Sequence, residues 1–366
     1  MSAHSILIAV MAVFAVLGAL DRIFGNKLGL GKQFEEGILA MGSLALAMVG
    51  IISFSPVLAT LLRPVVVPVY TFLGADPAMF AGSILACDMG GGALAREMAN
   101  DPAVADLGGV LCGSMLGATV VFTIPVALGI LREEDRPFLA KGALCGIVTI
   151  PVGILIGGLV AGYPILTVLR NLIPIVLLAA LIALGLRKAE RAMIRGFTVF
   201  GKGVLAVITV GLGAAIVEAL TGFTLIPGME PIETGFATVG EIAIVLAGAL
   251  PLVYAITKVL RKPLMGLGRL LRVNETAAAG LIASLANSIA TFGLLREMDN
   301  RGKVVNIAFA VSAAFVFGDH LGFAAGFAPD MLLPMIVGKL IAGICAVLVA
   351  LLLTREKGKD EPQKKS

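Results

Sequence analysis

Charged residues are scarce in this sequence. Only 14% of its 366 residues are Asp, Glu, Lys or Arg, and 58% are hydrophobic, whereas a typical soluble domain has about 25% charged residues. This composition excludes a water-soluble globular protein. Apolar runs of about 18 residues or more recur along almost the whole chain, and such a run can cross the hydrocarbon core of a bilayer as a helix. The sequence therefore indicates an all-α polytopic membrane protein surrounded by membrane lipid.

Cysteine and histidine are scarce as well. The two histidines are accompanied by no HExxH or GxSxG motif, so an intramembrane enzyme that uses the pair Asp319-His320 is a remote alternative. The net charge of +4 is modest, and the basic residues cluster at helix ends, which is typical of membrane topology and not of nucleic-acid binding. We expect no catalytic site, metal, cofactor or nucleic-acid partner. The cysteines lie in apolar runs without CxxC spacing: Cys87, Cys112, Cys145 and Cys345.

Nine segments are predicted to be transmembrane helices, because each is long and apolar enough. They are residues 4–20, 36–61, 105–131, 137–161, 164–186, 197–220, 236–257, 303–325 and 330–354. Two further apolar segments are interrupted by polar and glycine residues. Segment 77–98 contains Cys87-Asp88-Met89-Gly90-Gly91-Gly92, and segment 275–297 contains Ser284-Leu285-Ala286-Asn287-Ser288. Each interruption favours a helix, a break and a second helix.

The two halves of the chain repeat each other at an offset of 198 residues. Ala81-Gly82 matches Ala279-Gly280 (279 − 81 = 198), and Lys141 matches Lys339 (339 − 141 = 198). Segment 164–186 is the one predicted span without a partner. We predict a first transmembrane repeat (1–161), a linking helix with a cytoplasmic amphipathic segment (162–196), a second repeat (197–354) and a charged cytoplasmic tail (355–366).

The distribution of Lys and Arg predicts how these repeats sit in the membrane. Three basic regions are expected on the cytoplasmic side: the junctions 187–202 and 258–272 and the Lys-rich tail. Segment 221–235 has two glutamates and no Lys or Arg, so it is expected outside. Segment 275–297 then starts and ends inside, and segment 77–98 starts and ends outside. Both are predicted to be re-entrant hairpins in inverted repeats, although Arg63 and Arg96 count mildly against this. The N-terminus is predicted outside and the C-terminus in the cytoplasm.

Acidic residues at membrane depth are the main candidates for a substrate site, because placing an aspartate there costs about 2.5–3.5 kcal/mol. Asp88 lies at the tip of the first predicted hairpin, where a helix cap is the alternative role. Asp319 lies between Gly318 and Gly322 in span 303–325, where a buried pair with His320 is the alternative. Two carboxylates from opposite repeats favour a cationic or ammonium-bearing solute.

Six other residues complete the predicted substrate-binding set. His320 is expected to orient a carboxylate, contact substrate or carry a proton, and Asn287 can offer an amide to a hydroxyl group or stabilise its hairpin instead. An ammonium paired with an aspartate and a hydroxyl paired with an amide suit an amino alcohol, and also other small amino compounds. The remaining candidates adjoin these tips or a Thr-Ile-Pro kink: Met89, Gly90, Ser288 and Thr123.

Four motifs in order along the chain carry a family resemblance. They are Phe34-Glu35-Glu36-Gly37, Ala86-Cys87-Asp88-Met89-Gly90-Gly91, Ile124-Pro125-Val126-Ala127-Leu128-Gly129, and Arg301-Gly302-Lys303 leading into Gly318-Asp319-His320-Leu321-Gly322-Phe323. Together they resemble the ethanolamine permeases of bacterial ethanolamine utilisation. The resemblance implies an inner-membrane protein that takes up ethanolamine by facilitated diffusion, with Asp88, Asn287 and Asp319 on the pathway. A proton- or sodium-coupled symporter remains the alternative, and a homo-oligomer is possible.

Overall fold

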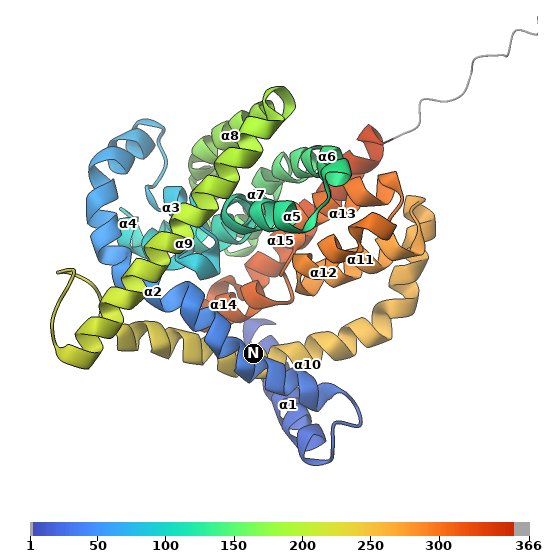
Figure 1. The fold of residues 1–366 in the computed structure, drawn as a ribbon, viewed down its shortest axis with the longest axis horizontal. Helices are drawn as coiled ribbons and strands as arrows, with labels where there is room; N and C mark the ends of the chain where they lie inside the picture. Colours follow the sequence, from blue (N-terminus) through green and yellow to red (C-terminus); the bar gives the residue numbers. More distant parts are fainter. Residues whose placement is uncertain (1–2, 355–366) are drawn as a thin grey trace, which may run out of the picture.

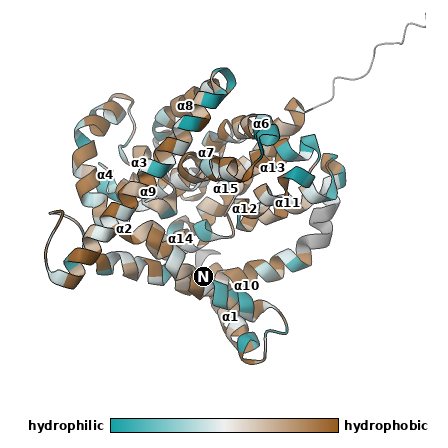
Figure 2. Cartoon of the chain, viewed as in Figure 1, coloured by the Kyte–Doolittle hydropathy of each residue, from teal (hydrophilic) through white to brown (hydrophobic). Residues whose placement is uncertain are grey.

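The computed structural model describes residues 3–354, and for residues 3, 4, 260–265 and 267 its backbone alone; the predicted cytoplasmic tail 355–366 lies outside the described residues. All regular elements in this range are helices, and eight stretches are long and apolar enough to cross a membrane. Many large apolar side chains of the long helices are exposed, as expected for surfaces that face lipid, and these helices are largely hydrophobic in Figure 2. The prediction of an all-α polytopic membrane protein is confirmed.

Four helices form a group that we call the scaffold. α2 packs along α10 and α9, and α1 lies against both α2 and α10 (Figure 1). The scaffold helices contain the predicted spans 4–20, 36–61, 197–220 and 236–257, but two of them, α2 with 43 residues and α10 with 40, are far longer than predicted. α2 is bent in Figure 1 and contains Pro56, Pro64 and Pro68, and proline inside a helix kinks it. Their bounds are α1 (Ala3–Ile23), α2 (Leu30–Phe72), α9 (Glu190–Thr221) and α10 (Ile232–Leu271).

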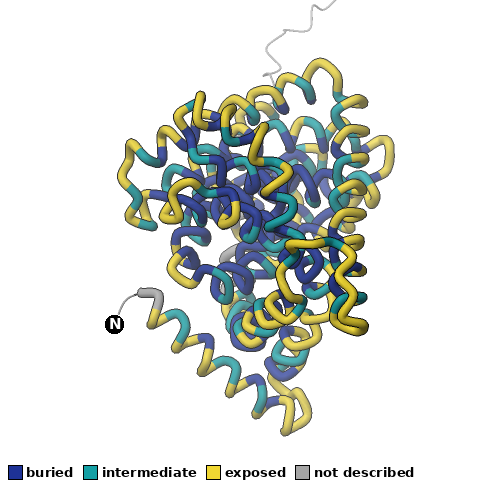
Figure 3. Tube along the Cα trace, turned by 90° about the vertical axis from the view of Figure 1, so that its left-hand side faces the viewer, coloured by how far each residue is buried: buried dark blue, intermediate teal, exposed yellow. Residues whose placement is uncertain are grey.

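The other helices form a second group, which we call the core unit. Within it α13 packs against α6, α15 against α7, and α3 against the π-helix η3. Most fully buried residues lie at the centre of the molecule (Figure 3). The helices are α3 (Ala78–Ile84), η1 (Cys87–Met89), α4 (Gly91–Met98), η2 (Pro102–Val104), η3 (Leu107–Gly117), η4 (Thr119–Thr123), α5 (Ile124–Ile130), η5 (Glu133–Asp135), α6 (Arg136–Ile147), α7 (Ile150–Val160), α11 (Glu275–Ala286), α12 (Ser288–Leu294), η6 (Leu295–Glu297), α13 (Asn300–Ala313), α14 (Asp319–Phe327), η7 (Pro329–Met331) and α15 (Leu332–Leu353).

α8 (Ile165–Lys188) packs on α7 and α6 and covers all but the first residue of the predicted span 164–186. The amphipathic segment expected up to residue 196 is not a separate surface helix, because residues from Glu190 onward form the first turns of α9. A single helix satisfies its own backbone without the extra caps that a separate helix would need.

The two interrupted segments each contain the predicted break. In segment 77–98, α3 and α4 pack against each other, and the carboxylate of Asp76 accepts hydrogen bonds from the backbone N–H groups of Asn100 (3.1 Å) and Asp101 (2.9 Å). In segment 275–297, α11 packs against α12, and the backbone N–H of Asn274 donates to Asp299 Oδ1 at 3.0 Å. The two ends of each segment therefore lie side by side.

The predicted continuous span 303–325 is wrong. α13 ends at Ala313, α14 begins at Asp319, and the backbone between them is not helical. The N–H groups of Phe315 and Phe317 donate to the carbonyl oxygens of Ser284 (3.1 Å) and Leu285 (2.8 Å) at the end of α11, in place of helical bonds. Gly318 permits this approach, because a Cβ there would lie 2.1 Å from the Ala286 oxygen. The described residues therefore contain eight long spans and a third broken segment instead of nine continuous spans.

Candidate functional site

A cavity of about 190 Å³ lies where the scaffold meets the core unit. A water molecule occupies about 30 Å³ of liquid, so the cavity suits a solute of a few heavy atoms with some water. The scaffold contributes one wall from α2, and the core unit contributes the α3–α4 break, η4 and the α13–α14 break. The lining residues are Ser43, Leu44, Ala47, Ala86, Asp88, Met89, Ala118, Phe122, Phe315, Asp319 and His320.

Both predicted carboxylates line this cavity. Asp88 lies in η1, and neither η1 nor α4 has a side-chain cap, so Asp88 does not act as the helix cap that was its alternative role. Asp319 lies in the first turn of α14, where the positive end of the helix dipole favours a carboxylate. Two half-buried acidic groups from opposite halves of the chain therefore share one small space, which favours a cation.

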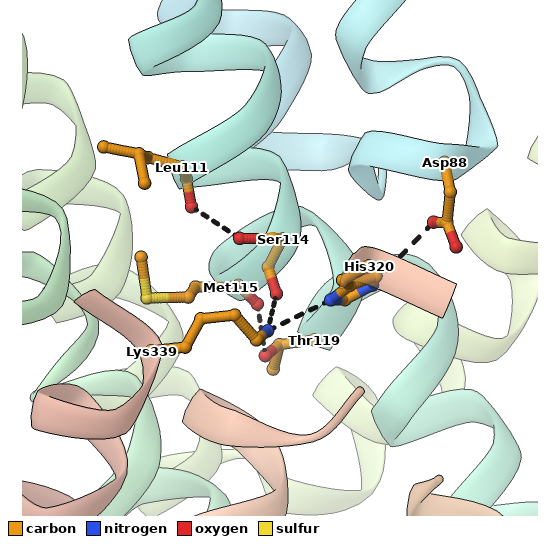
Figure 4. Close-up of polar contacts among 7 residues, drawn as sticks. All are labelled: Asp88, Leu111, Ser114, Met115, Thr119, His320 and Lys339. Carbon is orange, nitrogen blue, oxygen red and sulfur yellow. Dashed lines mark hydrogen bonds and ion pairs between the residues drawn. The ribbon is translucent and has the colours of Figure 1, made fainter. Parts of the chain in front are cut away.

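His320 connects the cavity to a buried lysine (Figure 4). Its Nε2 lies 3.8 Å from Asp88 Oδ1, so the partner of His320 is Asp88 and not the neighbouring Asp319. Its Nδ1 lies 3.1 Å from Nζ of Lys339, which also donates to the backbone oxygen of Ser114. His320 and Lys339 are 3% and 1% exposed, respectively. The buried amino group of Lys339 on α15 therefore lies directly behind the cavity residue His320.

Sequence reasoning missed Lys339, although a signal for it is present. It is the single charged residue of α15, where the rest of the helix is apolar or small. A lysine at bilayer depth is as costly as an aspartate and marks a functional site by the same argument. Lys339 could therefore be recognised in the same way as Asp88 and Asp319.

The other predicted site residues are arranged less uniformly. Met89 lines the cavity, whereas Gly90, Thr123, Asn287 and Ser288 are not among its lining residues. The Asn287 side chain accepts the N–H of Ile289 at 2.8 Å and caps α12, which is the hairpin-stabilising alternative. Gly90 has φ +92, so glycine is needed there. Ser288 is buried, and its Oγ has no partner among the described residues.

The cluster of Cys87, Asp88 and His320 is poorly suited to a metal ion. Their potential ligand atoms lie within 4.8 Å of one another. However, a neutral imidazole that accepts a hydrogen bond from Lys339 at Nδ1 carries its proton on Nε2. That nitrogen, which faces Asp88, then has no lone pair for a metal. The buried ammonium of Lys339 would also repel the ion.

A second pocket of about 390 Å³, which we call the acidic vestibule, lies farther along α2. Residues 43–47 of α2 line the central cavity and residues 52–55 line the vestibule. At 1.5 Å per helical residue the two spaces are roughly 12 Å apart. The vestibule is lined by Ile52, Ser55, Ala93, Arg96, Glu97, Glu230, Thr234, Thr238, Glu241, Gly326 and Phe327.

An aromatic pair, which we call the aromatic closure, lies on the part of α14 that runs from the cavity residues Asp319 and His320 to the vestibule residues Gly326 and Phe327. Phe323 and Phe327 of α14 stack at a centroid distance of 4.7 Å, and a Cβ at Gly92 of α4 would lie within 3 Å of both rings. Arg96 lies 3.8 Å from the Phe327 ring centroid, donates to the Phe327 oxygen at 3.0 Å, and pairs with Asp106 at 3.0 Å. These contacts join α4 to α14 on the vestibule side.

Long apolar helices around a small acidic cavity, with broken helices at its walls, define a polytopic membrane protein of the transporter class. The family model described as "Ethanolamine utilisation protein, EutH" matches residues 3–353. This chain belongs to the EutH family of ethanolamine utilisation proteins, which confirms the resemblance described above.

Curated relatives match over nearly their full length. The chain is 59% identical to the probable ethanolamine permease EutH of Listeria monocytogenes, over 100% of this chain and 98% of that protein. It is 48% identical to the proteins of the same name from Salmonella typhimurium and Escherichia coli, over 96% of each chain. No solved structure matches. The relatives are named as permeases, which confirms a transporter and not an enzyme.

Proposed function

We infer that this protein is a bacterial inner-membrane permease that carries ethanolamine through the cavity formed by Asp88 and Asp319. Ethanolamine is the solute named for the permease relatives in Listeria, Salmonella and Escherichia. The observation that carries the proposal is that two carboxylates from opposite halves of the chain line one cavity of about 190 Å³. Charge-assisted hydrogen bonds from an ammonium group to carboxylates are strong.

The cavity also offers a partner for the hydroxyl group of the solute. If the ammonium group of Lys339 donates to His320 Nδ1, the neutral ring carries its proton on Nε2, which then points toward Asp88 and the cavity as a donor. The walls beside it are apolar, from Ala47, Phe122 and Phe315, and suit the two methylene groups. The predicted roles of Asn287, Ser288, Gly90 and Thr123 stay proposals, because these residues would join the pathway only in another conformation.

The architecture belongs to the same proposal: two inverted repeats, each with a re-entrant hairpin. Asp76 and Asn274, which hold the ends of the two interrupted segments together, are themselves 198 residues apart (274 − 76 = 198). The packing repeats as well. A Cβ at Gly82 would contact Gly108, and a Cβ at Gly280 would contact Asn306. The second contact is the first one shifted by 198 residues (280 − 82 = 198 and 306 − 108 = 198).

In the proposed topology, α13, its break and α14 together make the ninth crossing. The N-terminus is then outside and the C-terminus cytoplasmic, with α8 as the unpaired crossing that inverts the second repeat. The acidic vestibule faces outward in this arrangement, since it includes Glu230 of the segment expected outside. Its carboxylates would attract cations toward the site.

Alternating access would then consist of movement of the core unit against the scaffold. The central cavity lies at the boundary between the two, because α2 forms one wall and the broken segments form the other. In this proposal the stacked pair Phe323 and Phe327, with Arg96, is the barrier between the cavity and the vestibule in the present conformation. Opening this contact is the step that would admit solute from outside.

Uptake of labelled ethanolamine into proteoliposomes tests the proposal. Purified full-length protein should equilibrate ethanolamine across the membrane faster than protein-free liposomes, and an excess of unlabelled ethanolamine should compete. Imposed proton or sodium gradients separate the alternatives. No protein-dependent uptake would contradict the permease, whereas accumulation above equilibrium would favour the symporter.

A further inference from the structure

Lys339 is a buried basic residue whose charge the transport proposal does not use, beyond the orientation of the His320 ring. It is 1% exposed in the middle of α15, and its Nζ contacts the Ser114 oxygen and His320 Nδ1. Burying a lysine within a bilayer is costly. The repeat does not account for it, because the matching residue, Lys141, is exposed on α6. A buried cation next to a proposed cation site therefore needs its own explanation.

The charges around the cavity give that explanation. Asp88 and Asp319 are the acidic residues of the lining, and we take both as ionised, with His320 as a neutral acceptor for the ammonium group of Lys339. With Lys339 the sum is −1 − 1 + 1 = −1. One monovalent cation brings the site to neutrality, which is the favourable state in a low-dielectric environment.

A site without Lys339 would carry a charge of −2 and would suit a dication. Ethylenediammonium is a sharp comparison, because it is ethanolammonium with a second ammonium in place of the hydroxyl. In the present site that second ammonium would face the Nε2–H donor of His320 and the field of Lys339, with no additional carboxylate. The site therefore favours a hydroxyl at that end.

We propose that Lys339 is a specificity-determining positive charge that restricts the site to solutes with one ammonium group and excludes diammonium compounds of the same size. It acts through His320, whose Nε2–H it directs toward the cavity, and through its own field. The inference rests on the proposed function, because it concerns the selectivity of the same cavity.

The test compares binding of ethanolamine and ethylenediamine to the purified full-length protein, at a pH where both amines of ethylenediamine are protonated. Lys339→Gln removes the charge and keeps an amide donor for Ser114 and His320. We expect the ratio of ethylenediamine to ethanolamine affinity to rise about tenfold or more, because unit charges a few ångströms apart interact strongly in a poorly screened site. Lys339→Arg should keep the wild-type preference, and Lys141→Met is the matched control at the exposed counterpart.

A charge-restoring pair gives an independent readout. Asp319→Asn alone leaves the site neutral and should weaken ethanolamine binding, whereas Lys339→Gln combined with Asp319→Asn returns the sum to −1 and should recover part of it. Because this double variant removes one charge of each sign, it also serves if Lys339→Gln alone does not fold.

The outcomes separate the two proposals. If the wild-type protein does not bind ethanolamine, the proposed function fails. If it binds ethanolamine but the ratio of the two affinities is the same in wild type and Lys339→Gln, and the double variant binds no better than Asp319→Asn, the role of Lys339 is overturned and the proposed function stands.

Discussion

Nε2 of His320 lies 3.8 Å from Oδ1 of Asp88, although 232 residues separate them in the chain (320 − 88 = 232). One residue comes from the break between α3 and α4, and the other from the first turn of α14. Neither break forms a cavity alone, since each supplies one face of it. A substitution that separates the two halves should therefore weaken solute binding while the individual helices stay folded.

Substituting either carboxylate tests the cavity directly. Asp88→Asn and Asp319→Asn keep the shape of the side chain and remove its charge. We expect each to weaken ethanolamine binding roughly 10- to 100-fold, because a hydrogen bond to a charged group contributes about 1.5–3 kcal/mol. Binding to purified protein measures this, and Asp330→Asn, at an exposed position in η7, is the control. Unchanged affinity in both variants, with folding retained, would remove the assigned site.

The buried ion pair between Asp135 and Lys303 joins η5 to α13. Asp135 Oδ1 lies 2.6 Å from Lys303 Nζ, and the two side chains are 3% and 13% exposed. Asp135→Asn leaves the ammonium of Lys303 without its partner, and breaking a buried pair in this way costs about 3–5 kcal/mol. We expect a clearly lower midpoint of thermal unfolding in detergent.

The control for that prediction is a nearby exposed pair. Arg132 and Glu134 lie 3.6 Å apart with both side chains largely exposed, and such pairs contribute less than about 1 kcal/mol. Glu134→Gln should therefore leave the midpoint almost unchanged. Equal midpoints for Asp135→Asn and the wild type would mean that the pair does not hold the two halves together.

The aromatic closure predicts a change in access to the cavity. Phe327→Ala removes the stacking contact with Phe323, which contributes about 0.5–1.5 kcal/mol of stabilisation. It also removes the cation–π contact with Arg96, which contributes about 0.5–1 kcal/mol. A cysteine at Ala47, on the cavity wall, should then react roughly 5- to 50-fold faster with an impermeant thiol reagent added outside intact cells. Phe72→Ala, at the exposed end of α2, should have no effect. An unchanged labelling rate would place the barrier elsewhere.

The positions of the two interrupted segments could be predicted from sequence because their breaks are local. The glycines after Asp88 interrupt the first apolar run, and Asn287-Ser288 interrupt the second. Both residue types weaken a helix locally, whatever the rest of the fold. The break in 314–318 could not be predicted in the same way. Ala314 to Phe317 are apolar, and what opens the helix is hydrogen bonding of Phe315 and Phe317 to the end of α11. That contact exists only in the folded protein.

In the candidate site, too, some residues could be predicted from sequence and others could not. Asp88 and Asp319 could be predicted because a carboxylate at membrane depth is costly wherever it points. The pairing of His320 with Asp88 depends on the relative placement of α14 and η1, which no spacing in the sequence encodes. Asn287 illustrates the converse, since residue type alone does not distinguish a ligand from the cap that its side chain forms on α12.

The proposed inverted arrangement makes a prediction about which side of the membrane each segment faces. Asp76 lies next to residues 100 and 101, and Asn274 next to Asp299; in the proposed topology the first group is outside and the second is cytoplasmic. Single cysteines at Thr71 and Asn100 should therefore react with an impermeant reagent from the outside, and cysteines at Glu275 and Asn300 from the cytoplasmic side in inverted vesicles. All four positions are exposed, so a lack of reaction from one side reports topology and not burial. Protein without an introduced cysteine sets the background. If Thr71 and Asn100, or Glu275 and Asn300, react from different faces, that segment crosses the membrane and the two halves are not inverted hairpin repeats.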